Sequence, residues 1–155
     1  MIEVYQTKFG GSNYPIEEQG NCMQAALASI LEIPLESSFN TNKYLDGKWY
    51  ERLNEWLSDF GLVMLGFDVT DGKQALLPKE IGYHLIEAKS TTLSNGDNHA
   101  LVGYNGEVIH DPNPYAKGVG EFEIFWVFSA LDPAKLRKPL PIFGYTYNCE
   151  VQIRT

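Results

Sequence analysis

The chain has 155 residues, of which 44% are hydrophobic and 21% are charged, and its formal net charge is −8. This length predicts one domain over residues 1–155, with the composition of a globular protein rather than a disordered one. The negative charge argues against nucleic acid as a partner and favours neutral or basic substrates. No apolar run approaches the roughly 20 residues that span a bilayer, and no signal peptide is visible, so we expect a cytoplasmic protein without membrane contact.

The first part of the chain predicts a strand and a helix. Residues 2–7 read as a strand and lead into a loop that contains glycine, asparagine and proline. Apolar residues at helical spacing then predict a helix over residues 22–32. Asn21 or Gly20 can cap its first turn, and Pro34 ends it because proline cannot continue a helix.

The middle of the chain predicts a second helix followed by strands. Tryptophan and leucine residues recur at helical spacing over residues 47–60, and Gly61 fits a C-terminal cap. Residues 62–69 and 82–88 are expected to form strands. The polar loop over residues 89–98 leads straight into the next strand and could form one wall of a site.

The last part of the chain predicts antiparallel strands. Residues 99–104 and 107–111 form the clearest hairpin, joined through an Asn-Gly pair. Alternating apolar residues predict further strands over residues 121–128 and 145–153. Because helices come early and antiparallel strands late, the expected fold class is α+β, with N-terminal helices packed on a C-terminal antiparallel β-sheet.

One cysteine occupies a position that suits a nucleophile. Cys22 begins the first expected helix, in the segment GNCMQAALASIL. Backbone N–H groups of a first helical turn stabilise a thiolate, and they can also hold the oxyanion that forms when a thiolate attacks a carbonyl. A lone cysteine is more often a small buried apolar residue, but His99 and Asp111 favour the nucleophile here.

His99 and Asp111 are the expected base and its orienting acid. They are the first and last residues of the hairpin, both at its open end, and a carboxylate bound to the ring would fix its tautomer and orientation. In a regular two-residue turn the two side chains would face opposite sides of the sheet. A three-residue loop, or another one-residue bulge, would place them on one side. A catalytic pair therefore predicts an irregular hairpin.

The other cysteine and histidines carry weaker predictions. Cys149 lies in an alternating strand and is expected to be a core thiol, with a Cys22–Cys149 disulfide as the alternative if the protein is exported. His84 and His110 are expected to be ordinary strand or surface residues. A metal site formed by His99, His110 and Asp111 is the alternative, but no HExxH or CxxC spacing supports it, so we expect neither metal nor cofactor.

The segments GNCMQAALASIL and HALVGYNGEVIHDP resemble papain-like cysteine peptidases. They look most like the compact branch that includes the bacteriocin-processing, double-glycine leader peptidases and small phage or bacterial relatives. That branch has a cysteine at the start of the first helix, then a histidine on a strand, then an aspartate followed by proline. The resemblance implies a papain-like fold with Cys22 as nucleophile, His99 as general base and acid, and Asp111 as orienting residue.

Two positions depart from the pattern of that branch. The leader peptidases usually carry a glycine directly after the cysteine, where this chain has Met23. They also carry an oxyanion-hole glutamine about six residues before the cysteine, where this chain has Ile16. Gln6 is the preferred candidate for that role, arriving from the N-terminal segment, and Gln19 is the alternative.

These residues together predict a cysteine-dependent hydrolase, a peptidase or amidase that forms a thioacyl-enzyme on a peptide, a protein or a small amide. A deamidase, transglutaminase or acyl-transferase would use the same three residues. A catalytically inactive papain-like module that binds a partner protein is the alternative from another class. A peptidoglycan-cutting enzyme would need export or a lytic delivery partner, and the sequence signals neither.

Overall fold

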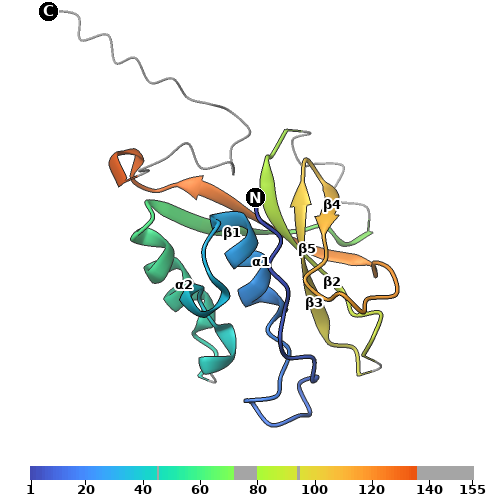
Figure 1. The fold of residues 1–155 in the computed structure, drawn as a ribbon. Coiled ribbons are helices and arrows are strands. Elements are labelled where there is room, and N and C mark those ends of the chain that lie inside the picture. Colours follow the sequence, from blue (N-terminus) through green and yellow to red (C-terminus); the bar gives the residue numbers. More distant parts are fainter. Residues whose placement is uncertain (45, 72–79, 94, 136–155) are drawn as a thin grey trace, which may run out of the picture.

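The structure is a computed structural model that describes residues 1–44, 46–71, 80–93 and 95–135. Within these residues it has two α-helices, α1 (Cys22–Leu31) and α2 (Trp49–Ser58), and one five-stranded sheet. Figure 1 shows both helices on the same side of the sheet. The strand expected over residues 145–153, together with Cys149, lies outside the described residues.

The sheet is antiparallel at every described pairing and has the strand order β1-β5-β2-β3-β4. Its strands are β1 (Leu62–Asp68), β2 (Tyr83–Lys89), β3 (Asn98–Tyr104), β4 (Glu107–His110) and β5 (Phe122–Ala130). Each helix and strand ends within two residues of its predicted bounds. The predicted α+β class, with early helices packed on a later antiparallel sheet, is confirmed.

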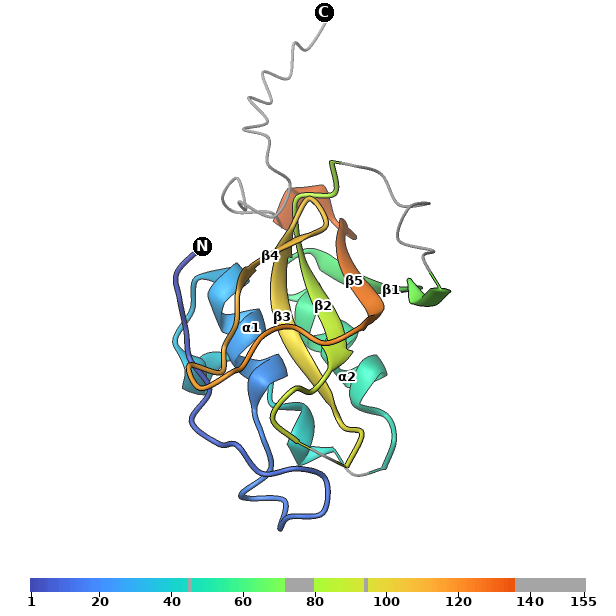
Figure 2. The same ribbon diagram turned by 90° about the vertical axis from the view of Figure 1, so that its right-hand side faces the viewer.

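The strand predicted over residues 2–7 is wrong. The Val4 N–H donates to the Ser29 hydroxyl of α1 at 3.0 Å, and the Gln6 N–H donates to the Pro112 carbonyl at 3.0 Å. The N–H groups of the segment therefore bond to a helix and to a loop rather than to the backbone of a neighbouring strand. Figure 2 shows it running beside α1 and the chain that follows β4.

Two apolar clusters lie on opposite faces of the sheet. The larger one fills the space between the helices and the sheet, and it includes Leu27, Ile30, Leu53, Leu57, Met64, Leu85, Val102 and Trp126. The smaller one consists of Val69, Ile86, Ala88, Leu101 and Phe125. Neighbouring strand residues such as Leu85 and Ile86 fall in different clusters because side chains of a strand alternate between its two faces.

Helix α1 is enclosed on all sides. Every residue from Gln24 to Leu31 is buried, because the sheet covers one side of the helix and the N-terminal segment crosses the other. Alanines at three of these positions let the helix approach its neighbours closely. The enclosure fixes the start of α1, and with it Cys22, against the sheet.

Candidate active site

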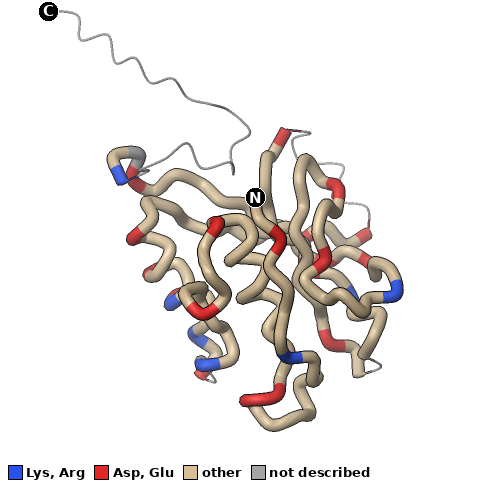
Figure 3. Tube along the Cα trace, viewed as in Figure 1, with Lys and Arg blue, Asp and Glu red and all other residues tan. Residues whose placement is uncertain are grey.

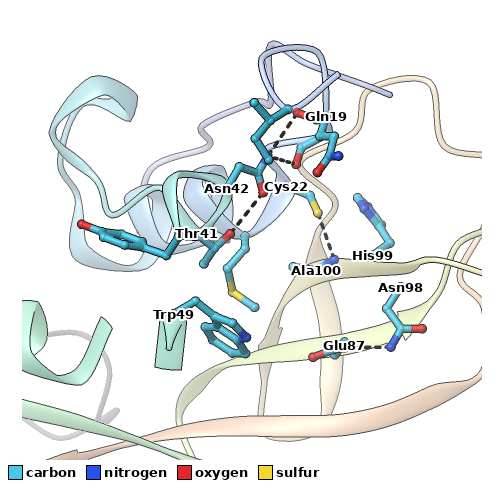
Figure 4. Close-up of a pocket in the computed structure, with 13 residues that line it drawn as sticks. Gln19, Cys22, Thr41, Asn42, Trp49, Glu87, Asn98, His99 and Ala100 are labelled. Carbon is cyan, nitrogen blue, oxygen red and sulfur yellow. Dashed lines mark hydrogen bonds between the residues drawn. The ribbon is translucent and has the colours of Figure 1, made fainter. Parts of the chain in front are cut away.

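Cys22 lies where the start of α1 meets the uncovered part of β3. Its sulfur accepts a hydrogen bond from the Ala100 N–H at 3.4 Å, as Figure 4 shows. The partner strand β4 pairs only with residues 102–104 of β3. The Ala100 N–H therefore has no strand partner on that edge, and it is directed at the sulfur instead.

Asn21 stands at the N-cap position of α1, as predicted, but its side chain does not cap the helix. Its Oδ1 accepts hydrogen bonds from the N–H groups of Thr7 and Lys8, both at 3.0 Å, and so ties the N-terminal segment to the start of α1. The first turn of α1 consequently has no side-chain cap. Its N–H groups, including that of Cys22, stay available to a negative charge at the site.

His99 and Asp111 are in direct contact. The His99 Nε2 atom lies 2.6 Å from Asp111 Oδ1, and the exposed fractions of the two side chains are 16% and 22%. The same Asp111 oxygen accepts the Asn113 N–H at 2.8 Å, which holds the carboxylate in place. Because Nε2 is occupied by Asp111, Nδ1 is the ring nitrogen left for the Cys22 sulfur.

The hairpin brings Asp111 to the side of His99 through a bulge. The described pairs are Tyr104 with Glu107, Gly103 with Val108, and Val102 with His110. The turn is therefore the two-residue form, but Ile109 is an extra residue in β4. The extra residue shifts the alternation of side chains between the two faces of the sheet by one position. Asp111 therefore lies on the same face of the sheet as His99. The predicted one-residue irregularity is confirmed, and it lies in β4 rather than in the turn.

The environment of His99 favours its protonated form. Burial lowers the pKa of the ring, but hydrogen bonds to Asp111 and to Cys22 outweigh it and raise the pKa from 6.5 to about 9. Protonation of His99 stabilises the fold below about pH 6.5, and this contribution is lost as the pH rises through about 9.

A pocket of about 350 Å³ opens beside Cys22 and His99. Its lining is partly apolar, through Met23 and Trp49, and partly polar, through residues of β2, β3 and the chain between the helices (Figure 4). The sequence suggested the loop over residues 89–98 as one wall of a site, and Asn98 of that range lines the pocket. It did not point to Glu87, although an acidic residue inside the apolar strand YHLIEAK is a recognisable signal.

The two candidate glutamines differ in the number of side-chain amide hydrogens that are not already used in hydrogen bonds. Gln19 lines the pocket, but its Nε2 donates to the Ser12 carbonyl at 3.2 Å and to the Tyr14 carbonyl at 2.9 Å. Both amide hydrogens of Gln19 are therefore used. Gln6 is buried beside Gly20, outside the pocket lining, and its Nε2 donates to the Lys8 carbonyl at 2.8 Å. One amide hydrogen of Gln6 remains, which favours Gln6 over Gln19 as an oxyanion donor.

The described residues contain no group of three or more His, Cys, Asp or Glu side chains that could hold a metal ion. The part of the chain that the structure describes also has no helix long and apolar enough to cross a membrane. Comparison of the chain with protein-family models, with curated proteins and with solved structures gives no match.

Proposed function

We propose that the protein is a papain-like cysteine hydrolase that cleaves amide bonds in a peptide or protein, with Cys22, His99 and Asp111 as its catalytic residues. One observation carries the proposal. The His99 ring is held by Asp111 at 2.6 Å, and its pKa is raised to about 9 by Asp111 and Cys22 together. A protonated imidazole beside a thiol at a helix start provides both an activated nucleophile and a proton for the leaving group.

In the proposed reaction, the Cys22 sulfur attacks the carbonyl carbon, and the electrons of the C=O double bond move to the oxygen. The Cys22 N–H and the remaining amide hydrogen of Gln6 would stabilise that oxyanion. His99 then donates its proton to the leaving nitrogen as the C–N bond breaks. In the second half, neutral His99 takes a proton from water, the hydroxide attacks the thioester, and the Cys22 thiolate leaves.

A deamidase, a transglutaminase and an acyl-transferase share the first half of this reaction and differ in the group that leaves or the group that accepts the acyl chain. The inactive binding module is less well supported, because such a module has no need for a histidine held by a carboxylate beside a thiol. A cytoplasmic location, expected from the sequence, would keep the thiol reduced and is part of the proposal.

Incubation of the purified protein with a mixture of synthetic peptides rich in Gln, Asn and Lys, followed by mass spectrometry, tests the proposal. A hydrolase produces new peptide termini, a deamidase converts side-chain amides to acids, and a transglutaminase joins an added primary amine to the peptides. We expect new termini in the untreated sample and none in a sample whose thiols were first blocked with iodoacetamide. Absence of all three products from a protein whose Cys22 is readily alkylated would leave only the binding role.

A further inference from the structure

Among the described residues, one carboxylate lies in the wall of the pocket beside the reactive pair. Glu87 of β2 lines the pocket along with Trp49 and Asn98 (Figure 4). Its Oε1 accepts a hydrogen bond from Asn98 Nδ2 at 2.7 Å, and its Oε2 accepts one from Trp126 Nε1 at 3.0 Å. Two uncharged donors thus hold both oxygens of the carboxylate in a fixed position.

Glu87 forms no ion pair among the described residues, and its link to a cation is indirect, through Asn98, whose Oδ1 accepts from Lys89 Nζ at 3.1 Å. The ion pairs in that part of the chain join the Met1 amine to Glu32, Arg52 to Asp46, Lys89 to Glu123, and His99 to Asp111. Lys89, two residues beyond Glu87 on the same strand, therefore has its own partner. A cation that enters the pocket can pair with this carboxylate, whose position is already fixed by Asn98 and Trp126.

We propose that the pocket binds a positively charged group of the substrate and that Glu87 is the residue that selects it. The inference rests on the proposed function, since the pocket adjoins Cys22 and His99. Trp49 supplies apolar surface for the hydrocarbon stem of a lysine or arginine side chain. The excess of acidic residues, spread over most of the described elements in Figure 3, attracts a cationic substrate from solution.

The cationic group can belong to either of the two parts of the substrate that the reaction separates or joins. It can be a basic side chain in the part of the peptide that becomes the thioester, or a primary amine in the part that leaves or that accepts the acyl group. The recognition chemistry is the same in both cases: an ammonium or guanidinium group opposite a fixed carboxylate.

The inference can be tested with methanethiosulfonate reagents of similar size that carry an ammonium, a hydroxyl or a sulfonate group. These reagents require no assumption about whether the cation belongs to the acyl chain or to the amine. They are applied to a Cys149→Ser protein, so that only Cys22 reacts. In each reaction the Cys22 sulfur forms a disulfide bond with the reagent sulfur, and methanesulfinate leaves with the electron pair. Each rate is divided by the rate of 2-mercaptoethanol with the same reagent, which removes the intrinsic reactivity of the reagent.

We expect the normalised rate to be at least about tenfold higher for the ammonium than for the sulfonate reagent, and Glu87→Gln to remove most of this difference. In the Glu87→Gln protein, the rate with the uncharged hydroxyl reagent should stay within about twofold of the rate measured with Glu87 present. This would confirm that the site of the variant is intact. Glu121→Gln removes the same charge from an exposed position outside the pocket lining and should leave the ratio unchanged.

Three results would overturn the inference. If the normalised rate of the ammonium reagent does not exceed that of the sulfonate reagent in the Cys149→Ser protein with Glu87 intact, a cation pocket is excluded, regardless of the result for Glu87→Gln. An unchanged ratio in a folded Glu87→Gln protein excludes Glu87 as the selecting residue, while Cys22 reactivity and the proposed function stand. Failure of Cys22 to react with any of the three reagents removes the proposed function and the inference with it.

Peptidyl chloromethyl ketones with lysine or norleucine next to the ketone locate the cation. In this reaction the Cys22 sulfur forms a C–S bond and chloride leaves, so these reagents occupy only the side of the site that holds the acyl chain. Faster inactivation by the lysine reagent assigns the cation to the acyl chain. Equal rates, together with a preference for the ammonium thiosulfonate, assign it to the leaving or accepting amine.

Discussion

Cys22→Ala is expected to lower the turnover of any peptide that the wild-type protein cleaves by about 10⁴-fold or more. The loss follows because the substrate carbonyl is attacked by the Cys22 sulfur, and among the described residues no other thiol lines the pocket. The measurement is the initial rate of product formation at matched protein concentrations, by mass spectrometry on one peptide from the mixture. Thermal unfolding of the variant should stay close to that of the wild type, because Cys22 is only partly buried.

Cys149→Ala is the matched control for this variant, because it removes the other thiol of the chain. It should retain wild-type turnover to within about twofold. Turnover in Cys22→Ala within about tenfold of the wild type would mean that the activity does not depend on a thioacyl-enzyme.

His99→Gln is expected to have two effects of different size. Turnover should fall by about 10³-fold, because the general acid and base for both halves of the reaction is lost. Alkylation of Cys22 by iodoacetamide at about pH 6.5 should fall by only about tenfold. An ordinary thiol is about 1% ionised at this pH, which lowers the rate. Its thiolate is more nucleophilic than the thiolate of a thiol with a low pKa, which offsets part of that loss. The Ala100 N–H and the first turn of α1 still face the sulfur in this variant.

His110→Gln provides the comparison for that variant. His110 lies on β4 with its Nε2 at 3.0 Å from the Val4 carbonyl, outside the pocket lining. Both rates should therefore stay within about twofold of the wild type. Above about pH 10, where both thiols are ionised, His99→Gln should be alkylated at least as fast as the wild type, because its thiolate is the more nucleophilic one. A variant that still reacts more slowly at that pH would point to a structural rather than an electrostatic effect.

The regular elements could be predicted because their signals are local. The spacing of apolar residues and Pro34 define α1, and the alternation of apolar residues defines β5. The positions of irregularities could not be predicted. Strict alternation over residues 121–128 would place Phe122 on the same face as Trp126, but the pairing of β2 with β5 shifts register between Glu87 and Ala88, and Phe122 packs against the smaller cluster.

The candidate site was predicted in its residue types and in the contact between His99 and Asp111, but not in the place of the irregularity that allows this contact or in its other contacts. The approach of Asp111 to His99 depends on the extra residue Ile109, and nothing in the local sequence marks that residue as a bulge. The hydrogen bond from the Ala100 N–H to the sulfur depends on how early β4 stops pairing with β3. The place of Glu87 in the pocket depends on long-range packing, which no local pattern records.

The most direct test of the central claim, that Cys22 and His99 act as a coupled pair, is an NMR titration of the His99 ring in the wild type and in Cys22→Ala. We predict a pKa of about 9 for His99 in the wild type and a lower pKa in the variant, because the hydrogen bond and the charge of the sulfur are removed while Asp111 remains. A His99 ring that titrates near its ordinary pKa of 6.5 in the wild type, or that has the same pKa in both proteins, would contradict the pairing.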